Sequence, residues 1–400
     1  MIQSHEAPQS LTGIAIRRLH TPRMILDNVL IEFDGTDIGV MGDFAGAAPP
    51  GYFDARGADL HVVPGMVDVH NHGCGGADFL DAGADDLQRI SMRAAAGGTT
   101  TIVPTISFPN DDPELKGLAA FTKTLRDFRP AGARLIGIHL EGPFLNPDRR
   151  GAFRDNYLAT IDLDRARHML EICGDLLLKI TMAPELENAD ELIALLSEYS
   201  DTEVEVSLGH TTAGYEFAQK HFAHPRVRQV THAFNAMHSF HHREPGLIGA
   251  ALLNDDVTCE MIPDGQHLAP PTLTLLHRLK GPKRLILVTD SCAATGLPRG
   301  ASVDGPAGPR IVRDEAIFLA DGTLTGSNIF MADAVQRAHE LGGIPYEDAL
   351  EMATLTPAIS IHRESLIGSI DPGKRADFCV LDSTGQPTAV IRDGLLVAGA

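Results

Sequence analysis

Eight short apolar segments occupy the middle of the chain, and amphipathic segments separate them. The apolar segments are Gly65–His72, Thr99–Ser107, Arg134–Glu141, Leu178–Glu185, Thr202–His210, Gln229–Met237, Val257–Asp264 and Arg284–Ser291. Helical periodicity is found at Asp85–Ala96, Pro113–Phe128, Asp164–Cys173, Ala189–Tyr199, Tyr215–Phe222 and Pro271–Leu279. Buried strands that alternate with helices are typical of an α/β protein with a parallel sheet. Eight such units predict a (β/α)8 TIM-type barrel, and a doubly wound open sheet is the alternative.

Polar residues at the ends of several apolar segments favour the barrel. A closed barrel gathers the C-terminal ends of all its strands into one pocket, whereas an open sheet spreads them along an edge. His70 and His72 end the first segment, and their spacing places both imidazoles on one face of a strand. By itself this pair is weak evidence for a metal, because two structural histidines would have the same spacing.

The two ends of the chain differ from its middle. Short strand-like segments separated by Gly and Asp turns occur before residue 64 and again after residue 377. Neither end is long enough to form a stable sheet alone. We therefore expect residues 1–63 and 365–400 to form one small β-sandwich domain, attached to a barrel of residues 64–364.

The composition limits the kinds of molecule that the chain is expected to bind. The chain is 44% hydrophobic and 22% charged, with a formal net charge of -20, so we expect a soluble protein that binds no nucleic acid. No apolar run has membrane-spanning length, and the polar N-terminus does not resemble a signal peptide. Five scattered cysteines without a C-x-x-C pair favour the reducing cytoplasm. An anionic substrate would need local cations to hold it.

Four further strand ends carry residues suited to a metal-dependent hydrolase: Glu141, His210, His232 and Asp290. Each alone is more simply explained as a capping or loop residue, but their joint occurrence at barrel strand ends predicts a site. Imidazole and carboxylate ligands suit a divalent ion, zinc first and iron as the alternative. Glu141, His210 and His232 would bind one ion, and His70 and His72 could share Glu141 with a second.

Such an arrangement predicts hydrolysis of an amide or related bond. A bound ion lowers the pKa of a coordinated water and polarises a neighbouring carbonyl. Asp290 is placed to accept the proton of that water and to return it to the leaving nitrogen.

Several stretches resemble the amidohydrolase superfamily, and within it the N-acetylglucosamine-6-phosphate deacetylases. They are Pro64–Gly73, His139–Leu145, Ser207–Thr211, Thr231–Met237, Arg243–Gly246, Asp264–His267, Thr289–Asp290 and Leu324–Ser327. His-Leu-Glu-Gly-Pro-Phe, and Phe-Asn-Ala-Met followed by Arg-Glu-Pro-Gly, are typical of this branch. The resemblance implies release of acetate from an N-acetylated amino sugar 6-phosphate.

The resemblance also implies roles for individual residues. Asp264 and His267 would bind the substrate, and His267 would polarise its acetyl carbonyl. Asn235 and Ala236 would contact the phosphate, and Arg243 would reach it from the neighbouring subunit of a homodimer. A loop formed by Leu324, Thr325 and Gly326 would close over the sugar.

One position departs from the family pattern. Deacetylases of this branch usually carry Lys-Gly-Ala-His after the Glu-Gly-Pro-Phe stretch, whereas this chain has Arg150-Gly151-Ala152-Phe153. Ala152 and Phe153 are expected at the substrate, and Arg149, Arg150 or Arg154 would replace the lost donor. N-acetylgalactosamine 6-phosphate and an unphosphorylated N-acyl compound are the alternative substrates. A catalytically inactive barrel that acts as a scaffold is the alternative from another functional class.

Overall fold

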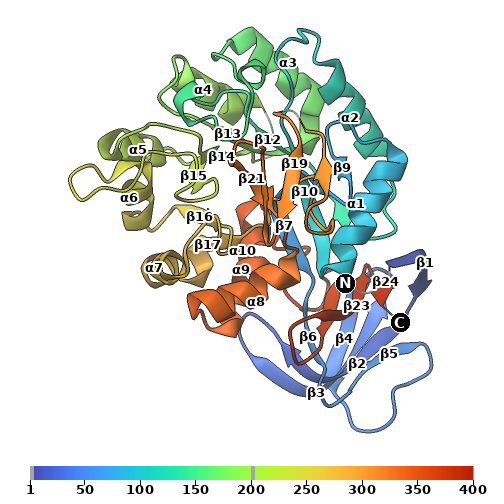
Figure 1. The fold of residues 1–400 in the computed structure, drawn as a ribbon. Coiled ribbons are helices and arrows are strands. Elements are labelled where there is room, and N and C mark those ends of the chain that lie inside the picture. Colours follow the sequence, from blue (N-terminus) through green and yellow to red (C-terminus); the bar gives the residue numbers. More distant parts are fainter. Residues whose placement is uncertain (1–3, 200–202, 306, 400) are drawn as a thin grey trace.

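The computed structural model describes residues 4–199, 203–305 and 307–399, and a barrel of parallel strands forms its centre (Figure 1). In barrel order the strands are β7 (Met66–Asn71), β10 (Thr99–Ile106), β12 (Ile138–Glu141), β13 (Leu177–Met182), β14 (Glu205–Leu208), β15 (Val227–Val230), β16 (Thr258–Met261) and β17 (Leu285–Leu287). A short strand, β11 (Arg134–Leu135), precedes β12 and also pairs with β10. The predicted barrel is confirmed, although Thr202, the expected start of one strand, lies outside the described residues.

Backbone hydrogen bonds close the barrel between its last strand and its first. The Asp290 N–H donates to the His70 carbonyl at 3.0 Å, and the His72 N–H donates to the Ser291 carbonyl at 2.8 Å. Asp68 lies fully buried at the same seam and accepts a hydrogen bond from the Thr289 hydroxyl at 2.6 Å. The ends of β7 and β17 are therefore side by side, although more than two hundred residues separate them in the sequence.

Helices cover the outside of the barrel (Figure 1). They are α1 (Ala84–Ala96), α2 (Lys116–Asp127), α3 (Leu163–Cys173), α4 (Ala189–Tyr199), α5 (Tyr215–Phe222), α6 (Gly246–Leu253), α7 (Pro270–Lys280), α8 (Met331–Gly342), α9 (Tyr346–Ala353) and α10 (Leu355–Ser360). The sequence analysis missed α6, because all but its last residue are buried and no polar face reveals a period. Within the described residues, no helix has the length and apolar character needed to cross a membrane.

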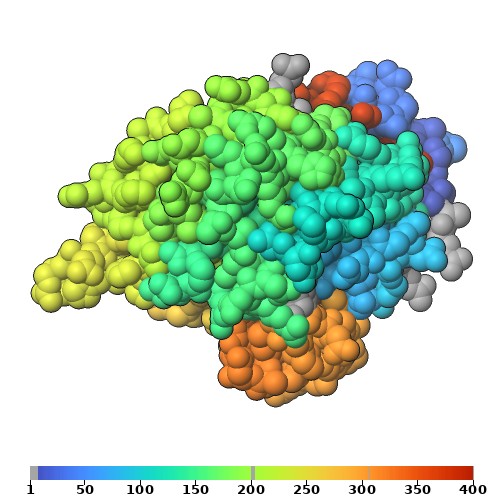
Figure 2. All heavy atoms as spheres, turned by 90° about the horizontal axis from the view of Figure 1, so that it is seen from above, coloured from blue at the N-terminus to red at the C-terminus, as the bar shows by residue number. Residues whose placement is uncertain are grey.

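A small antiparallel sheet stands beside the mouth of the barrel. It consists of β18 (Ser302–Val303), β19 (Arg310–Arg313), β20 (Ala316–Phe318) and β21 (Leu324–Ser327). Seen from above, this orange segment projects from the body of the molecule (Figure 2). It rejoins the barrel where the Ser327 N–H donates to the Asp290 carbonyl at 3.1 Å.

Segments from both ends of the chain form a separate sheet. Its main order is β1 (Ser4–Ser10), β24 (Leu395–Gly399), β23 (Pro387–Arg392), β22 (Phe378–Leu381), β6 (His61–Pro64), β2 (Gly13–His20), β3 (Ile25–Asp34) and β4 (Asp37–Asp43), and β5 (Tyr52–Ala55) pairs with β2. Alternating side chains from these strands, among them Ile14, Ile16 and Phe378, form a hydrophobic core distinct from that of the barrel. The antiparallel pair of β6 and β22 joins the N-terminal half of this sheet to the C-terminal half.

Arg134 ties the barrel to the C-terminal segment. Its guanidinium donates to both carboxylate oxygens of Asp377, at 2.9 and 3.1 Å, and also contacts Asp393. The Asp377 side chain is only 5% exposed, so the pair is shielded from water. A bidentate pair of this kind is geometrically specific, and removing one partner leaves an uncompensated charge.

We expect Arg134→Met to lower the free energy of unfolding by about 3 kcal/mol, because the buried carboxylate of Asp377 would lose its cation, whereas Asp393 would keep Arg392. Urea unfolding followed by circular dichroism measures the change. Arg18→Met is the matched control, since Arg18 pairs with Asp27 at the surface, where both side chains are more than half exposed; its loss should be below about 1 kcal/mol. Equal losses in the two variants would contradict the assigned role of Arg134.

Candidate metal centre and substrate cavity

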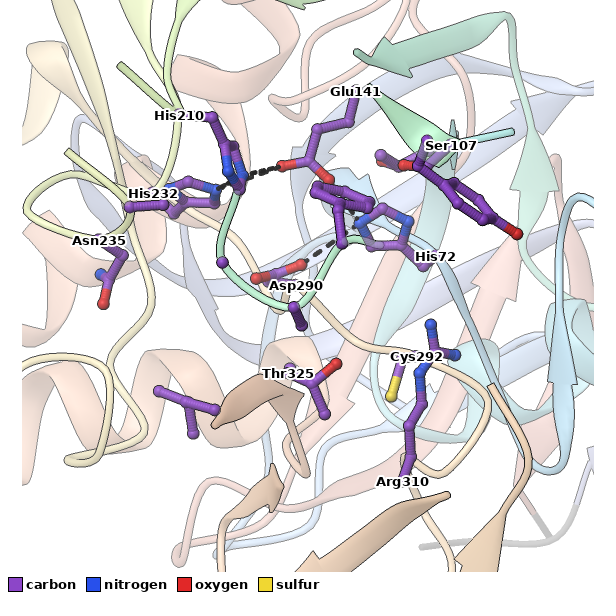
Figure 3. A pocket seen from close by; sticks show the side chains of 18 of the residues that line it. His72, Ser107, Glu141, His210, His232, Asn235, Asp290, Cys292, Arg310 and Thr325 are labelled. Carbon is purple, nitrogen blue, oxygen red and sulfur yellow. Dashed lines mark hydrogen bonds and ion pairs between the residues drawn. The ribbon is translucent and has the colours of Figure 1, made fainter. Parts of the chain in front are cut away.

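Six side chains meet at the C-terminal end of the barrel, and Figure 3 labels all of them except His70. They are His70, His72, Glu141, His210, His232 and Asp290. Three of them have left-handed backbone conformations, with φ of 48° at His210, 29° at His232 and 47° at Asp290. Non-glycine residues adopt this region at a cost, and such strain is concentrated at functional sites. In each case the turn at the strand end directs the side chain inward.

Glu141, His210 and His232 form the first group. Nε2 of His210 and Nε2 of His232 lie 3.3 and 3.2 Å from Glu141 Oε1, and 3.0 Å from each other. His210 Nδ1 donates to the Arg149 carbonyl at 2.8 Å, so neutral His210 presents an unprotonated Nε2 to the centre. An unprotonated nitrogen and a carboxylate that face one another fit a shared cation, because otherwise an acceptor would oppose an acceptor.

His70, His72 and Glu141 form the second group. His72 Nε2 lies 3.0 Å from Glu141 Oε2, and His70 Nε2 lies 3.5 Å from Glu141 Oε1. His70 Nδ1 donates to Glu260 at 2.9 Å, while its buried Nε2 has no hydrogen-bond partner in the part of the chain that the structure describes. The ligand atoms in each group lie within 4.8 Å of one another. This donor set also suits a divalent ion, so Glu141 could belong to two ion sites.

The charge on Glu141 is strongly favoured by its surroundings. Burial alone would raise the pKa of this carboxyl group. His70, His210 and His232 outweigh that effect and hold its pKa well below the ordinary value. Glu141 is therefore an anion at the centre of four imidazoles.

Asp290, which follows β17 in the chain, faces the second group. Its Oδ1 lies 3.4 Å from His70 Nε2 and 3.5 Å from His72 Nε2, and its side chain is 16% exposed. The carboxylate thus borders both the ligand cluster and the open cavity. A group in this position can exchange a proton with a molecule bound beside the cluster.

A cavity of about 310 Å³ opens above the cluster. Its walls include most residues that the sequence analysis placed at the site: His72, Glu141, Ala152, Phe153, His210, His232, Asn235, Ala236, His267, Asp290, Leu324, Thr325 and Gly326. The centroids of the Phe153 and His210 rings lie 5.3 Å apart. The wall of the cavity beside His210 is therefore aromatic at this position.

Asp264 contacts His267 and does not line the cavity itself. Its Oδ2 accepts a hydrogen bond from His267 Nδ1 at 2.6 Å, and its Oδ1 accepts from the backbone N–H groups of Gln266 and His267, both at 2.8 Å. This pattern fixes the orientation of the imidazole. Asp264 acts here through His267.

Arg243 lies away from the cavity of its own chain. It is exposed on the segment 238–245, which projects in yellow in Figure 2, and its Nη1 contacts His242 Nε2 at 3.0 Å. Arg149, Arg150 and Arg154 are likewise not among the described residues that line the cavity. None of the four arginines named in the sequence analysis thus reaches this cavity from within the same chain.

The structure places residues in the cavity that the sequence analysis missed: Asp78, Leu80, Asp81, Thr105, Ser107, Gly151, Tyr157, Cys292, Arg310 and Thr323. Asp78 and Asp81 follow the first barrel strand, where a barrel places its functional loops, so this position was a usable signal. Arg310 pairs with Asp78 and projects from β19. No strand-end pattern could have indicated it.

Cys292 is a wall residue with little nucleophilic character. Burial raises the pKa of its thiol to about 11, so the thiol stays protonated near neutral pH.

Comparisons with known proteins agree with this geometry. The amidohydrolase family model matches residues 61–397. An N-acetylglucosamine-6-phosphate deacetylase of Bacillus subtilis is 35% identical over 329 residues, 82% of each chain. An N-acetylgalactosamine-6-phosphate deacetylase of Escherichia coli O157:H7 is 30% identical over 82% of this chain and 85% of that protein.

A mutant N-acetyl-D-glucosamine-6-phosphate deacetylase of Mycobacterium smegmatis has been solved in complex with N-acetyl-D-glucosamine-6-phosphate. It superposes with a TM-score of 0.87 at 30% identity, covering 97% of this chain and 100% of that one. The resemblance inferred from the motifs is thereby confirmed. The chain belongs to the amidohydrolase family.

Proposed function

We propose that this protein hydrolyses the amide of N-acetyl-D-glucosamine 6-phosphate, giving glucosamine 6-phosphate and acetate. The observation that carries the proposal is the position of Asp290, whose carboxylate faces the ligand cluster on one side and the cavity on the other. A proton acceptor beside converged metal ligands suits the attack of water on an acyl carbon. The names of the relatives from Bacillus subtilis and Mycobacterium smegmatis support this substrate.

Glu141, His210 and His232 would hold the principal ion, and His70 and His72 would share Glu141 with a second. Zinc is the expected metal and iron the alternative, because the ligands are imidazoles and carboxylate without thiolate. A bound ion would supply Lewis acidity to the acetyl carbonyl and to the attacking water.

Asp290 would perform both proton transfers. Its carboxylate takes a proton from the attacking water and later delivers it to the sugar nitrogen as the amide bond breaks. His267, oriented by Asp264, would hydrogen-bond the substrate near its acetyl carbonyl. Both residues border the same cavity, so one bound sugar would contact both.

The phosphate would lie near Asn235 and Ala236. Figure 3 shows Asn235 on the opposite side of the pocket from Arg310. Because the whole chain carries a formal net charge of -20, local donors must hold an anion against the overall field. The exposed Arg243 would supply a cation to the phosphate site of a neighbouring protomer, so the expected unit is a homodimer. The expected compartment is the cytoplasm.

Phe153 is the reason to keep a second candidate. An aromatic ring offers no donor to a sugar hydroxyl, and the E. coli O157:H7 relative is named for N-acetylgalactosamine 6-phosphate. That isomer, or an unphosphorylated N-acyl compound, is therefore the alternative substrate. An acetate-release assay over both phosphorylated isomers and their free sugars separates the candidates.

Asp290→Asn is expected to lower kcat for acetate release by about a thousandfold, because an amide cannot accept the water proton. Metal content per subunit should stay that of the unsubstituted protein. Asp85→Asn, at an exposed position in the first turn of α1, is the matched control and should leave kcat unchanged. Near-normal turnover in Asp290→Asn would rule out Asp290 as the general base.

Arg243→Ala is expected to raise KM for the phosphorylated sugar by about 10- to 100-fold, because a hydrogen bond to a charged group is lost. Turnover of the free sugar should not change. Steady-state kinetics on the two substrates measure this split. Arg167→Ala removes an exposed arginine on α3 that pairs with Asp164 and serves as the control; an equal effect in both variants would contradict phosphate recognition by Arg243.

A further inference from the structure

A second charged cluster lies inside the barrel beneath the converged ligands. Its members, Glu260 on β16 and Lys179 on β13, are both fully buried, and Lys179 Nζ donates to Glu260 Oε1. These two strands are not neighbours in the barrel, so the ion pair crosses the interior. Burying two charges is costly, and apolar residues of similar volume would often be at least as stable. Stability therefore does not by itself account for this pair.

The other oxygen of Glu260 reaches both candidate ion groups. Glu260 Oε2 accepts from His70 Nδ1 at 2.9 Å and from the backbone N–H of His232 at 3.0 Å. The first contact fixes the His70 tautomer and directs Nε2 toward Glu141 and Asp290. The second holds the strained turn, with φ of 29°, that carries His232. One carboxylate thus supports a ligand from each group.

His139 stabilises the same arrangement from the side. Its ring lies edge-on to His70, with 4.9 Å between ring centroids. Its two nitrogens are fixed by the hydroxyl groups of Thr105 at 3.1 Å and Thr181 at 2.8 Å. His70 is therefore held by a hydrogen bond at Nδ1 and by packing on its ring, which leaves Nε2 as its free ligand atom.

We propose that Glu260, held in place by Lys179, is a positioning residue that orients His70 and His232 together and so couples metal binding at the two groups. The inference rests on the metal site of the proposed function but not on its substrate. Glu141 would link the two ions by direct ligation, and Glu260 would link their ligands from below. Loss of the Glu260 acceptor should then weaken both sites, although it contacts only one histidine of each group.

Two double variants separate the acceptor from the charge. Lys179→Met with Glu260→Leu removes the acceptor and the charge at position 260, whereas Lys179→Met with Glu260→Gln removes the charge but keeps a neutral acceptor. Lys179→Met is included in both so that no unpaired ammonium is left buried. Zinc stoichiometry and affinity are measured by chelator competition, without substrate. We expect the leucine variant to bind both ions about 10- to 100-fold more weakly and the glutamine variant to recover most of that loss.

Glu205→Gln is the matched control. Glu205 is also nearly buried in a barrel strand and accepts from an imidazole, His362 Nε2 at 2.7 Å, but it begins β14 rather than ending near the ligands. The zinc affinity of Glu205→Gln should equal that of the unsubstituted chain. Glu260→Asp, which keeps both charges and shortens the side chain, covers the case in which the leucine variant fails to fold, and it should lose affinity at both sites.

The results that overturn the proposal are specific. One is normal zinc affinity in the folded double variant Lys179→Met with Glu260→Leu, or in folded Glu260→Asp. The others are weaker binding of one ion only, or an equal loss of zinc affinity in Glu205→Gln. If zinc affinity falls as expected but no N-acetylhexosamine phosphate is turned over, the positioning role stands and the proposed substrate falls.

Discussion

The carboxylate of Glu141 is the interaction around which the site is organised. Four imidazole nitrogens from three other strand ends lie within 3.5 Å of its two oxygens. A single buried anion can satisfy so many nitrogens only if protons or cations lie between them. The barrel makes this convergence possible, because its closed sheet brings distant strands to one rim and fixes each side chain on a rigid element.

The residues below the Glu141 carboxylate and those above it differ in what they contact. Below it, Glu260 and Lys179 occupy the barrel interior and hold the backs of the ligands. Above it, Asp290 borders the cavity, part of whose wall is formed by β21 of the small antiparallel sheet.

The sequence predicted the barrel and the convergence of six polar side chains because both follow from the period of the apolar segments and from the residues that end them. It did not predict α6, whose buried sequence lacks a polar face. Arg310 was missed because its position depends on a hairpin rather than on a strand end. Asp264 was expected at the substrate, and its contact with His267 depends on a local turn. Arg243 was expected to reach a neighbouring subunit, and the structure places it on an exposed loop away from the cavity of its own chain.

The sheet formed by the two ends of the chain has a consequence for biosynthesis. β6 finds its partner β22 only after the whole barrel sequence has been made, and β1 pairs with β24, the last strand. Until the ribosome releases the C-terminal residues, the N-terminal strands present an open edge capable of pairing with other chains. Synthesis of β22 and β24 is thus the step that removes an aggregation hazard created when the N-terminal strands are made.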